Sequence, residues 1–421
     1  MAPQKKATLL IKNIGQLITM EGPAPRLGDQ MKDLGLIEGG GVAVAGEEVL
    51  AVGKSDEVEG KVDLAEGCQV IDAKGEVVTP GFIDPHTHPV FSKTRQAEFE
   101  MRILGKSYME IAEAGGGIRA SVRDLRETKT SELTRITSAR LETLLSYGVT
   151  TLEAKSGYGL STESEIKSLE IIRDLNNTQV LDLVPTFLGA HEVPDEYRDN
   201  REEYIRILIE EMIPRVADEK LAEFCDIFCE EGVFSIEESR RIMQAALDHG
   251  LKLKFHADEL ASTGGGELAA ELGAVSADHL VFISDEGIRA MAKAGTVAVL
   301  LPGTSFSLAH GHYAPGRKMI ESGVAVALST DCNPGSSFTE SLPLIITLAA
   351  LNYKMTAAES IAAVTVNAAC AIDRGGQIGQ LVKGLPADLV LWDMADYREL
   401  PYHYGVNLVK KVVKRGKIVV G

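Results

Sequence analysis

The sequence predicts an α/β protein in which a (β/α)8 barrel of the TIM type carries a smaller β-sandwich domain built from both chain ends. Three observations predict this fold. Short β-type runs occupy the first 80 residues, apolar strands then alternate with amphipathic helical stretches, and β-type sequence returns after about residue 375. We therefore expect residues 1–80 and 375–421 to form the sandwich domain, and residues 81–374 to form the barrel.

The β-type segments at the two chain ends are short and alternate weakly between apolar and polar residues. Those before the barrel are Ala7–Ile11, Gly41–Ala45, Val49–Val52, Val70–Asp72 and Glu76–Thr79. Their spacing by glycine, proline and acidic residues is typical of an antiparallel sheet. Those after the barrel are Ala387–Trp392 and Leu408–Val420, the second with a hairpin turn near Arg415 and Gly416. Because a few isolated strands are marginally stable, we expect both ends to share one domain.

Eight short apolar runs between these ends are predicted to be the barrel strands. They are Gly81–Pro85, Val149–Ala154, Val180–Phe187, Phe224–Cys229, Leu251–His256, Ala277–Val281, Thr296–Leu301 and Val324–Thr330. Helical patterns lie between most of them, at Leu133–Leu145, Glu163–Leu175, Glu202–Val216, Ile236–Leu247, Glu267–Leu272, Asp285–Ala294 and Gly316–Glu321. Ser235 followed by Glu238 is a capping box that predicts where one of these helices begins.

Composition excludes several classes of protein. A formal net charge of −18 argues against a general nucleic-acid binder, and 45% hydrophobic with 25% charged residues is typical of a soluble globular protein. The most apolar stretch, Leu342–Ala350, is about half a membrane span and is expected to be a packed helix. Lys5, Lys6 and Lys12 interrupt any secretory leader. Five cysteines without a C-x-x-C pair favour free thiols in the cytoplasm: Cys68, Cys225, Cys229, Cys332 and Cys370.

Histidines gather where barrel strands are predicted to end, which is where barrel active sites lie. His86 and His88 follow the first strand in an H-x-H pattern, whose two side chains project to the same side of an extended chain. Further histidines end later strands or closely follow them: His191, His256, His279 and His310. Alternation along the last strand places Asp331 inward at the mouth. The lysines at 252 and 254 share the parity of His256, and the sequence offers no account of lysines inside the barrel.

Three imidazoles and one carboxylate suit zinc or ferrous iron and leave room for a reactive water. Glu259, three residues after His256, is placed to take a proton from that water, and His279 to polarise a carbonyl. The residues alone leave other interpretations open. His279 could be a core histidine, Glu259 a solvated loop acid, and Arg95 a surface cation paired with a nearby glutamate.

Pro80–His88, a later strand-end histidine, Ser329-Thr-Asp331 and Gly384-x-x-Ala-Asp-Leu-Val390 together resemble the amidohydrolase superfamily. The resemblance implies a metal-dependent hydrolase built as a barrel flanked by a composite β-sandwich. Binuclear members carry a carboxylated lysine or an acid on the fourth strand. Here that strand lacks lysine and ends in Cys-Glu-Glu, so we expect a mononuclear site, with Glu230 a minor candidate ligand and Cys332 a packing residue.

Five finer motifs, in order, resemble one group of that superfamily, the ring-opening hydrolases of histidine degradation. They are Phe91–Arg95, Glu153–Leu160, Phe187–His191, His256–Glu259 and Asp331–Ser336. The resemblance implies hydrolysis of 4-imidazolone-5-propanoate to N-formimidoyl-L-glutamate by a homodimer. It implies one zinc or iron ion per subunit on His86, His88, His256 and Asp331, with catalysis by Glu259, His279 and Asp331. It also implies that the substrate is bound by Arg95, Tyr158, His191, Asn333, Gly335 and Ser336.

Two alternatives remain open at this stage. A related amidohydrolase acting on another small cyclic amide or a nucleobase would need a pocket for a neutral ring, whereas Arg95 and Tyr158 suit a carboxylate. A non-catalytic scaffold would be expected to lack metal ligands, and all four are present. Gly115–Gly117 and Gly264–Gly266 lack the order of a phosphate-binding loop and are interpreted as loop punctuation, the first near the barrel mouth.

Overall fold

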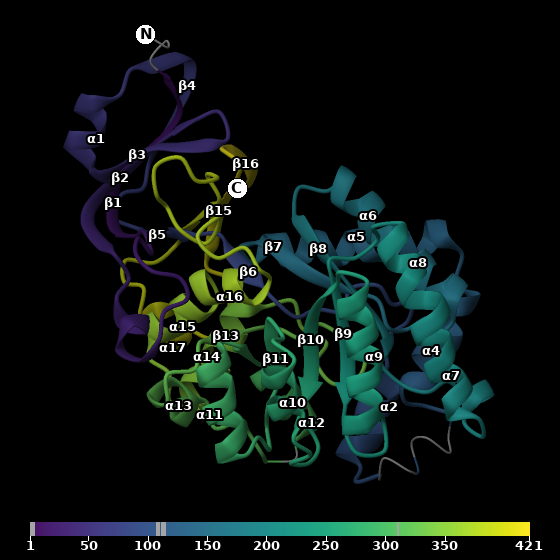
Figure 1. Cartoon of the computed structure of the whole chain (residues 1–421). Helices are drawn as coiled ribbons and strands as arrows, with labels where there is room; N and C mark the ends of the chain where they lie inside the picture. The colour runs from purple at the N-terminus through teal and green to yellow at the C-terminus, as the bar shows by residue number, and fades with distance from the viewer. Residues whose placement is uncertain (1–4, 107–109, 111–114, 310) are drawn as a thin grey trace.

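A parallel barrel forms the centre of the computed structural model, which describes residues 5–106, 110, 115–309 and 311–421 (Figure 1). Its eight strands among the described residues are β6 (Phe82–Asp84), β7 (Val149–Lys155), β8 (Asp182–Ala190), β9 (Phe224–Cys229), β10 (Lys252–Ala257), β11 (Ser276–His279), β12 (Val297–Leu300) and β13 (Val326–Leu328). They pair in sequence order from β6 to β13. The first and last strands are linked by side chains, since Thr330 and Ser329 donate hydrogen bonds to Asp84. The predicted barrel and all eight predicted strands are confirmed.

Helices surround the barrel and connect its strands. Those of the first half are α2 (Gln96–Ile103), α4 (Ile118–Glu127), α5 (Thr130–Ser146), α6 (Thr162–Thr178), η2 (Asp195–Tyr197), α7 (Arg201–Ile207), η3 (Leu208–Met212), α8 (Ile213–Asp218) and α9 (Ile236–Asp248). Those of the second half are α10 (Gly265–Glu271), α11 (Asp285–Ala294), α12 (Pro302–Leu308), α13 (Gly316–Glu321), α14 (Leu342–Asn352), α15 (Ala357–Ala363) and α16 (Val366–Ala371). The capping box of Ser235 and Glu238 opens α9 as predicted.

One predicted helix, Glu202–Val216, is divided into α7, the π-helical turn η3 and α8. Pro214 lies in the first turn of α8 and has no N–H to donate to the preceding turn. A locally widened turn is a common way to absorb such a break. The helix is therefore present as predicted, but it is not a regular α-helix.

Small side chains of the last strand fill the amino-terminal end of the barrel. Ala325 and Ala327 pack with Val299 and Phe224 in one buried cluster, to which α16 also contributes. Val326, of opposite parity, belongs to the large cluster between the barrel and its helices. The alternation predicted for this strand is confirmed, and it leaves the carboxyl-terminal end of the barrel for polar side chains.

A second sheet combines both chain ends, which lie together in Figure 1. Its strands are β1 (Ala7–Ile18), β2 (Leu36–Ala45), β3 (Glu48–Lys54), β4 (Leu64–Asp72), β5 (Val77–Pro80), β14 (Leu389–Trp392), β15 (Val409–Lys414) and β16 (Lys417–Val420). Two short helices, η1 (Gly28–Lys32) and α1 (Ser55–Lys61), occur in the N-terminal part, and α17 (Glu399–Tyr402) precedes β15. The antiparallel pairing of β14 with β5 joins the two ends, as predicted.

The expectation of a purely antiparallel sheet is wrong, because β1 pairs in parallel with both β4 and β5. The physical reason is the connection. Helix α1 lies between β3 and β4 and works as a crossover, which allows β4 to approach the free edge of β1 in the same direction. Sequence periodicity within each strand carries no information about this choice.

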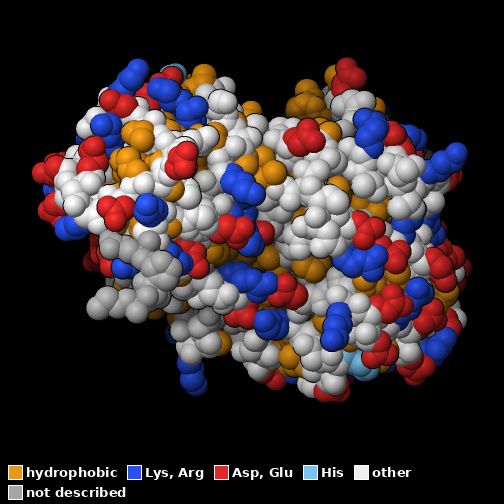
Figure 2. Space-filling model, turned by 90° about the horizontal axis from the view of Figure 1, so that it is seen from above, with side chains coloured by type: hydrophobic (Ala, Val, Ile, Leu, Met, Phe, Trp, Pro, Cys, Tyr) orange, Lys and Arg blue, Asp and Glu red, His pale blue; other side chains and the backbone are white. Residues whose placement is uncertain are grey.

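The surface mixes charges of both signs. On the face seen in Figure 2, acidic and basic side chains are interspersed. Among the described helices, none has the length and apolar character needed to cross a bilayer. All five cysteines are free, and three of them, Cys225, Cys229 and Cys332, are buried, in agreement with the prediction of free thiols.

Candidate metal centre and substrate cavity

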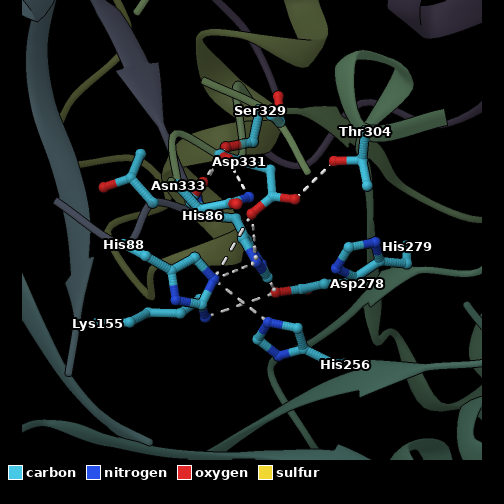
Figure 3. Close-up of polar contacts among 12 residues, drawn as sticks. His86, His88, Lys155, His256, Asp278, His279, Thr304, Ser329, Asp331 and Asn333 are labelled. Atoms are coloured by element: carbon cyan, nitrogen blue, oxygen red, sulfur yellow. Dashed lines mark hydrogen bonds and ion pairs between the residues drawn. The ribbon is translucent and has the colours of Figure 1, made fainter. Parts of the chain in front are cut away.

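His86 and His88 converge just beyond the carboxyl end of β6. Both side chains are buried, and their Nε2 atoms lie 3.3 Å apart (Figure 3). The extended chain between them directs both imidazoles into the mouth of the barrel, as the i, i+2 spacing predicts. The backbone N–H of His88 donates to the carbonyl of Cys332, which ties this strand end to the loop after β13. Cys332 is buried there, which agrees with a packing role.

His256 at the end of β10 and Asp331 after β13 complete a cluster of four. Nε2 of His256 lies 3.4 Å from Nε2 of His88. Oδ1 of Asp331 lies 3.5 Å from Nε2 of both His86 and His88. A tetrahedral ion with bonds of about 2.0–2.1 Å separates its ligand atoms by about 3.3–3.4 Å. Four distances among these side chains are thus close to those of a tetrahedral metal site, and His86, His88 and Asp331 form one candidate group whose ligand atoms all lie within 4.8 Å of one another.

The electrostatics of the cluster also fit a cation. Burial lowers the pKa of His86 and His88 well below the ordinary value, so both imidazoles are neutral and have lone pairs free for a metal. Burial raises the pKa of Asp331 to about 7, although Oδ2 accepts a 2.6 Å hydrogen bond from Thr304. Its other oxygen, Oδ1, is buried and has no hydrogen-bond partner in the described structure. A metal ion would satisfy it.

A layer of buried charges lies beneath this cluster. Asp278 on β11 is 2.5 Å from Nδ1 of His86, and Asp226 on β9 is 3.0 Å from Nδ1 of His256. Lys155, at the end of β7, is fully buried, and its Nζ lies 2.6 Å from Asp226. These acids hold each ring by Nδ1, so Nε2 is turned toward the cluster.

Lysine inside the barrel is explained by the same layer. Nζ of Lys254 lies 2.9 Å from Glu153, which also lies 2.9 Å from Lys155. Lys254 further donates to the carbonyl of Pro85 at 2.9 Å. Lys252 faces outward instead and pairs with Asp373. Burial would lower the pKa of Lys155, but its acidic neighbours, Asp226 first, outweigh burial and raise it. The lysine is therefore charged.

This layer, which contains Glu153, Lys155, Asp226, Lys254 and Asp278, is not predicted from the sequence. Charged residues occur within four apolar strands, β7, β9, β10 and β11, where a buried charge is costly unless it meets a partner of opposite charge. The sequence does not explain the lysine at 254, because its partner Glu153 comes from a strand that is distant in sequence.

Glu259 and His279 lie beside the cluster. Nδ1 of His279 is 3.5 Å from Oε1 of Glu259. Burial raises the pKa of Glu259 to about 8 and lowers that of His279 well below its ordinary value. His279 also forms a group with His86 and His256 in which the candidate ligand atoms all lie within 4.8 Å. The structure thus places both residues beside the histidine cluster, as predicted from the sequence.

Glu230 has a different environment from that of the four clustered residues. Its Oε2 accepts hydrogen bonds of 2.9 Å from the backbone N–H groups of Glu259 and Leu260. The carboxylate therefore fixes the start of the loop that carries Glu259. This contact gives Glu230 a structural role that the sequence analysis, which considered it as a ligand, did not foresee.

A cavity of about 1010 Å³ opens over the cluster. All six predicted substrate-binding residues line it: Arg95, Tyr158, His191, Asn333, Gly335 and Ser336. Arg95 lies next to Glu98, with Nε 3.1 Å from the carboxylate, and it also faces the cavity. A second guanidinium, that of Arg102, donates at 3.1 Å to the carbonyl of Gly335. The cavity is thus lined by guanidinium groups, although acidic side chains line it as well.

Tyr158 and His191 form an aromatic wall beside the candidate metal ligands. Their ring centres are 5.3 Å apart, and the ring of His191 stacks on that of His88 at 5.2 Å. Nδ1 of His191 lies 2.9 Å from the carbonyl of Gly157 and donates to it. Its Nε2 is therefore an acceptor. Burial lowers the pKa of His191 to about 3, so the ring is neutral.

Asn333 shapes the loop after β13. Its Oδ1 accepts 2.8 Å hydrogen bonds from the N–H groups of Gly335 and Ser336, and its Nδ2 donates to the carbonyl of Asp331 at 2.7 Å. The amide is thus engaged within its own loop, although the residue lines the cavity. Its contribution to the cavity is to set the turn that presents Gly335 and Ser336.

The two glycine-rich segments are loop punctuation, as predicted. Gly115 and Gly117 have positive φ and precede α4, and Gly117 lines the cavity. Gly264 also has positive φ and directly precedes α10, which begins at Gly265. His310, another of the strand-end histidines, lies outside the described residues.

A family model and curated proteins match almost the whole chain. Residues 77–419 match the model of the amidohydrolase family. The imidazolonepropionase of Alkaliphilus metalliredigens is 49% identical over 413 residues, covering 98% of each chain. The imidazolonepropionase of Geobacillus sp. strain WCH70 is 51% identical over 416 residues, again covering 98% of each. A buried cluster of histidines and aspartate is typical of metal-dependent members of this family.

Solved structures share the fold at low sequence identity. A zinc-bound adenosine deaminase from Xanthomonas campestris has a TM-score of 0.69 and 17% identity, covering 99% of this chain and 94% of that one. An atrazine chlorohydrolase variant from Arthrobacter aurescens, complexed with zinc and atraton, has a TM-score of 0.69 and 18% identity, covering 98% and 95%. Such likenesses show the fold alone.

Proposed function

The chain belongs to the amidohydrolase family and, within it, to the imidazolonepropionases, and from this premise we propose the reaction and the roles of individual residues. The reaction is hydrolysis of the ring C–N bond of 4-imidazolone-5-propanoate to N-formimidoyl-L-glutamate, a step of histidine degradation. The observation that carries the proposal is a cavity lined both by three residues of the cluster, His88, His256 and Asp331, and by Arg95. The substrate has the matching pair of groups, a ring carbonyl and a carboxylate.

One divalent ion, zinc or iron, is held by His86, His88, His256 and Asp331. Formal charge supports this. Three buried carboxylates, those of Glu153, Asp226 and Asp278, face the two ammonium groups of Lys155 and Lys254, and a fourth, that of Asp331, lies beside His86 and His88. A dication offsets the remaining two negative charges. When bound, such an ion lowers the pKa of a coordinated water and polarises a carbonyl. The donor set admits both metals.

Hydrolysis then depends on three groups of the chain. The Glu259 carboxylate takes a proton from the water as the water oxygen bonds to the ring carbonyl carbon. His279 stabilises the negative charge that develops on the carbonyl oxygen. Glu259 or Asp331 delivers a proton to the ring nitrogen as the C–N bond breaks. The ring opens, and the products are a new carboxylate and a formimidoyl group.

The other end of the substrate is bound by residues remote from this bond. Arg95 takes the propionate through charge-assisted hydrogen bonds, and Tyr158 contacts the same carboxylate. Nε2 of His191 accepts from a ring N–H, and Ser336 supplies a further polar contact. Gly335 is required for space, because a Cβ there would lie 2.6 Å from Cζ of Arg95.

The test uses the purified protein, elemental analysis and freshly generated 4-imidazolone-5-propanoate. The expected result is about one zinc or iron ion per chain, consumption of the imidazolone, and appearance of N-formimidoyl-L-glutamate without free ammonia. Release of ammonia from a nucleobase, with the imidazolone unchanged, would instead assign the chain to the aminohydrolases. Metal-loaded protein that transforms neither compound would refute the proposed reaction.

The setting of the enzyme is also proposed. We expect a homodimer in the cytoplasm, with residues 1–80 and 375–421 as one domain and 81–374 as the other. Sedimentation of the purified chain would check the dimer, and limited proteolysis near residues 80 and 375 would check the domain division.

A further inference from the structure

Glu165 is a buried carboxylate that no step of the proposed mechanism uses. It lies in the first turn of α6 and is fully inaccessible to solvent. Its Oε1 accepts hydrogen bonds from the backbone N–H groups of Gly159, at 2.7 Å, and Leu160, at 2.9 Å. Its Oε2 accepts one from Gly157 at 3.0 Å. One side chain thus holds three amides of the segment that contains Tyr158.

The same segment is held from its other side by Arg126 on α4. Nε of Arg126 donates at 2.7 Å to the carbonyl of Gly159, and Nη2 donates at 2.9 Å to that of Leu160. Glu165 on α6 therefore accepts from the N–H groups of Gly159 and Leu160, while Arg126 on α4 donates to their carbonyl groups. The segment also packs closely against the start of α6, since a Cβ on Gly159 would lie 2.5 Å from the backbone of Ser164.

The clamped segment sets two groups of the substrate cavity. The Tyr158 ring lies between its flanking glycines and faces the ring of His191. The carbonyl of Gly157, whose N–H is bound by Glu165, accepts the Nδ1 proton of His191 and so leaves Nε2 as the acceptor. Movement of this segment would displace Tyr158. It would also break the hydrogen bond that keeps the proton of His191 on Nδ1.

We propose that Glu165 is the positioning residue for substrate recognition, acting through Tyr158 and His191 without touching the substrate. This inference rests on the proposed function. A carboxylate suits the task because it offers two oxygens as acceptors and no donor. Glutamine would present one oxygen and one NH2 group, so at least one of the three amides would lose its partner and would face a donor instead.

The test compares Glu165→Gln with wild type in steady-state turnover of 4-imidazolone-5-propanoate and in inhibition by imidazole-4-propanoate. That inhibitor carries the same side chain on a ring that has no amide bond to open. We expect KM and the inhibition constant to rise together by about 10- to 100-fold, with kcat within about threefold, because recognition is disturbed remote from the reacting bond. Bound metal should be unchanged.

Two further variants separate this role from general stabilisation. Glu359→Gln is the matched control: Glu359 is equally buried and also accepts a backbone N–H at a helix start, but it pairs with Arg317 away from the cavity. It should lower Tm and leave KM unchanged. Arg126→Gln loosens the same segment from its more exposed side and should raise KM by about three- to tenfold. If Glu165→Gln does not fold, Arg126→Gln decides the question.

The outcomes are distinguishable. Wild-type turnover combined with an unchanged KM and inhibition constant in Glu165→Gln overturns the inference alone. A roughly 10- to 100-fold loss of kcat in Glu165→Gln with unchanged KM also overturns the inference. Wild-type protein that does not consume the imidazolone overturns the proposed function and this inference with it.

Discussion

Gly335→Ala adds one methyl group to the chain, and we expect it to weaken substrate binding through Arg95. The new Cβ would lie 2.6 Å from Cζ of Arg95 and 2.9 Å from its Nη1. Ordinary contact begins at 3.4 Å and Nη2 of Arg95 would lie closer to the new Cβ than Cζ does, so the guanidinium must move by more than about 0.8 Å. Gly335 is held by Asn333 and Arg102, which makes the side chain of Arg95 the easier group to displace.

The magnitude follows from the bonds that this movement breaks. A hydrogen bond to a charged group contributes about 1.5–3 kcal/mol. At about 1.4 kcal/mol for each factor of ten, loss of one such bond to the propionate raises KM by about 10- to 150-fold. Because Gly335 and Arg95 are remote from the bond that breaks, kcat should remain within about threefold of wild type.

The assay is initial-rate consumption of 4-imidazolone-5-propanoate over a range of concentrations, for Gly335→Ala, Arg95→Ala and the double variant. In the double variant the methyl group meets no guanidinium, so its effect on KM should disappear. Gly60→Ala, where a Cβ would meet nothing within 4 Å, is the control for adding a methyl group. An undiminished effect of Gly335→Ala in the absence of the Arg95 guanidinium would refute the reasoning.

Four further predictions concern the metal centre. Glu259→Gln should lower kcat by about 10²- to 10⁴-fold with metal content unchanged, and normal turnover would exclude it as the proton acceptor. Asp278→Asn replaces the carboxylate beside Nδ1 of His86 with a neutral amide and should weaken metal binding by about 10- to 100-fold, measured by competition with a chromophoric chelator. Lys155→Met removes the buried ammonium group that faces Asp226 and Glu153 and should lower the free energy of unfolding in urea by about 3–5 kcal/mol; a loss below about 1 kcal/mol would contradict this. Removal of metal by a chelator should abolish turnover and lower Tm, and zinc should restore both.

The fold was largely predictable because it depends on local patterns. Apolar runs of strand length, separated by amphipathic helices, specify parallel β/α units whatever their partners are. The predicted strands agree with the observed ones within two or three residues for most of the barrel. The strand Phe224–Cys229 and the helix Asp285–Ala294 agree at both ends. Parallel pairing of β1 was not predictable, because the crossover through α1 and not the pattern within β1 determines it.

The candidate site was predictable where a residue type alone indicates chemistry. Histidines and acids at strand ends indicated the candidate metal ligands His86, His88, His256 and Asp331, which the structure brings close together, and the cavity is lined by all the residues expected to bind substrate. The assignment of roles to these residues stays a prediction, as do the domain division, the homodimer and the choice of metal.

Sequence by itself determined the barrel, the composite second sheet and the identity of the polar residues at the mouth, because periodicity and strand-end position are local properties of the chain. Only the tertiary structure decided which charges meet. Lys254 on β10 is stable inside the barrel because Glu153, from β7, lies 2.9 Å from it, and Lys155 on β7 is stable there because Asp226, from β9, lies 2.6 Å from it. A buried charge is tolerated only beside a partner of opposite charge. The pairing of the barrel strands determines which residues meet, because it brings together residues that are distant in sequence.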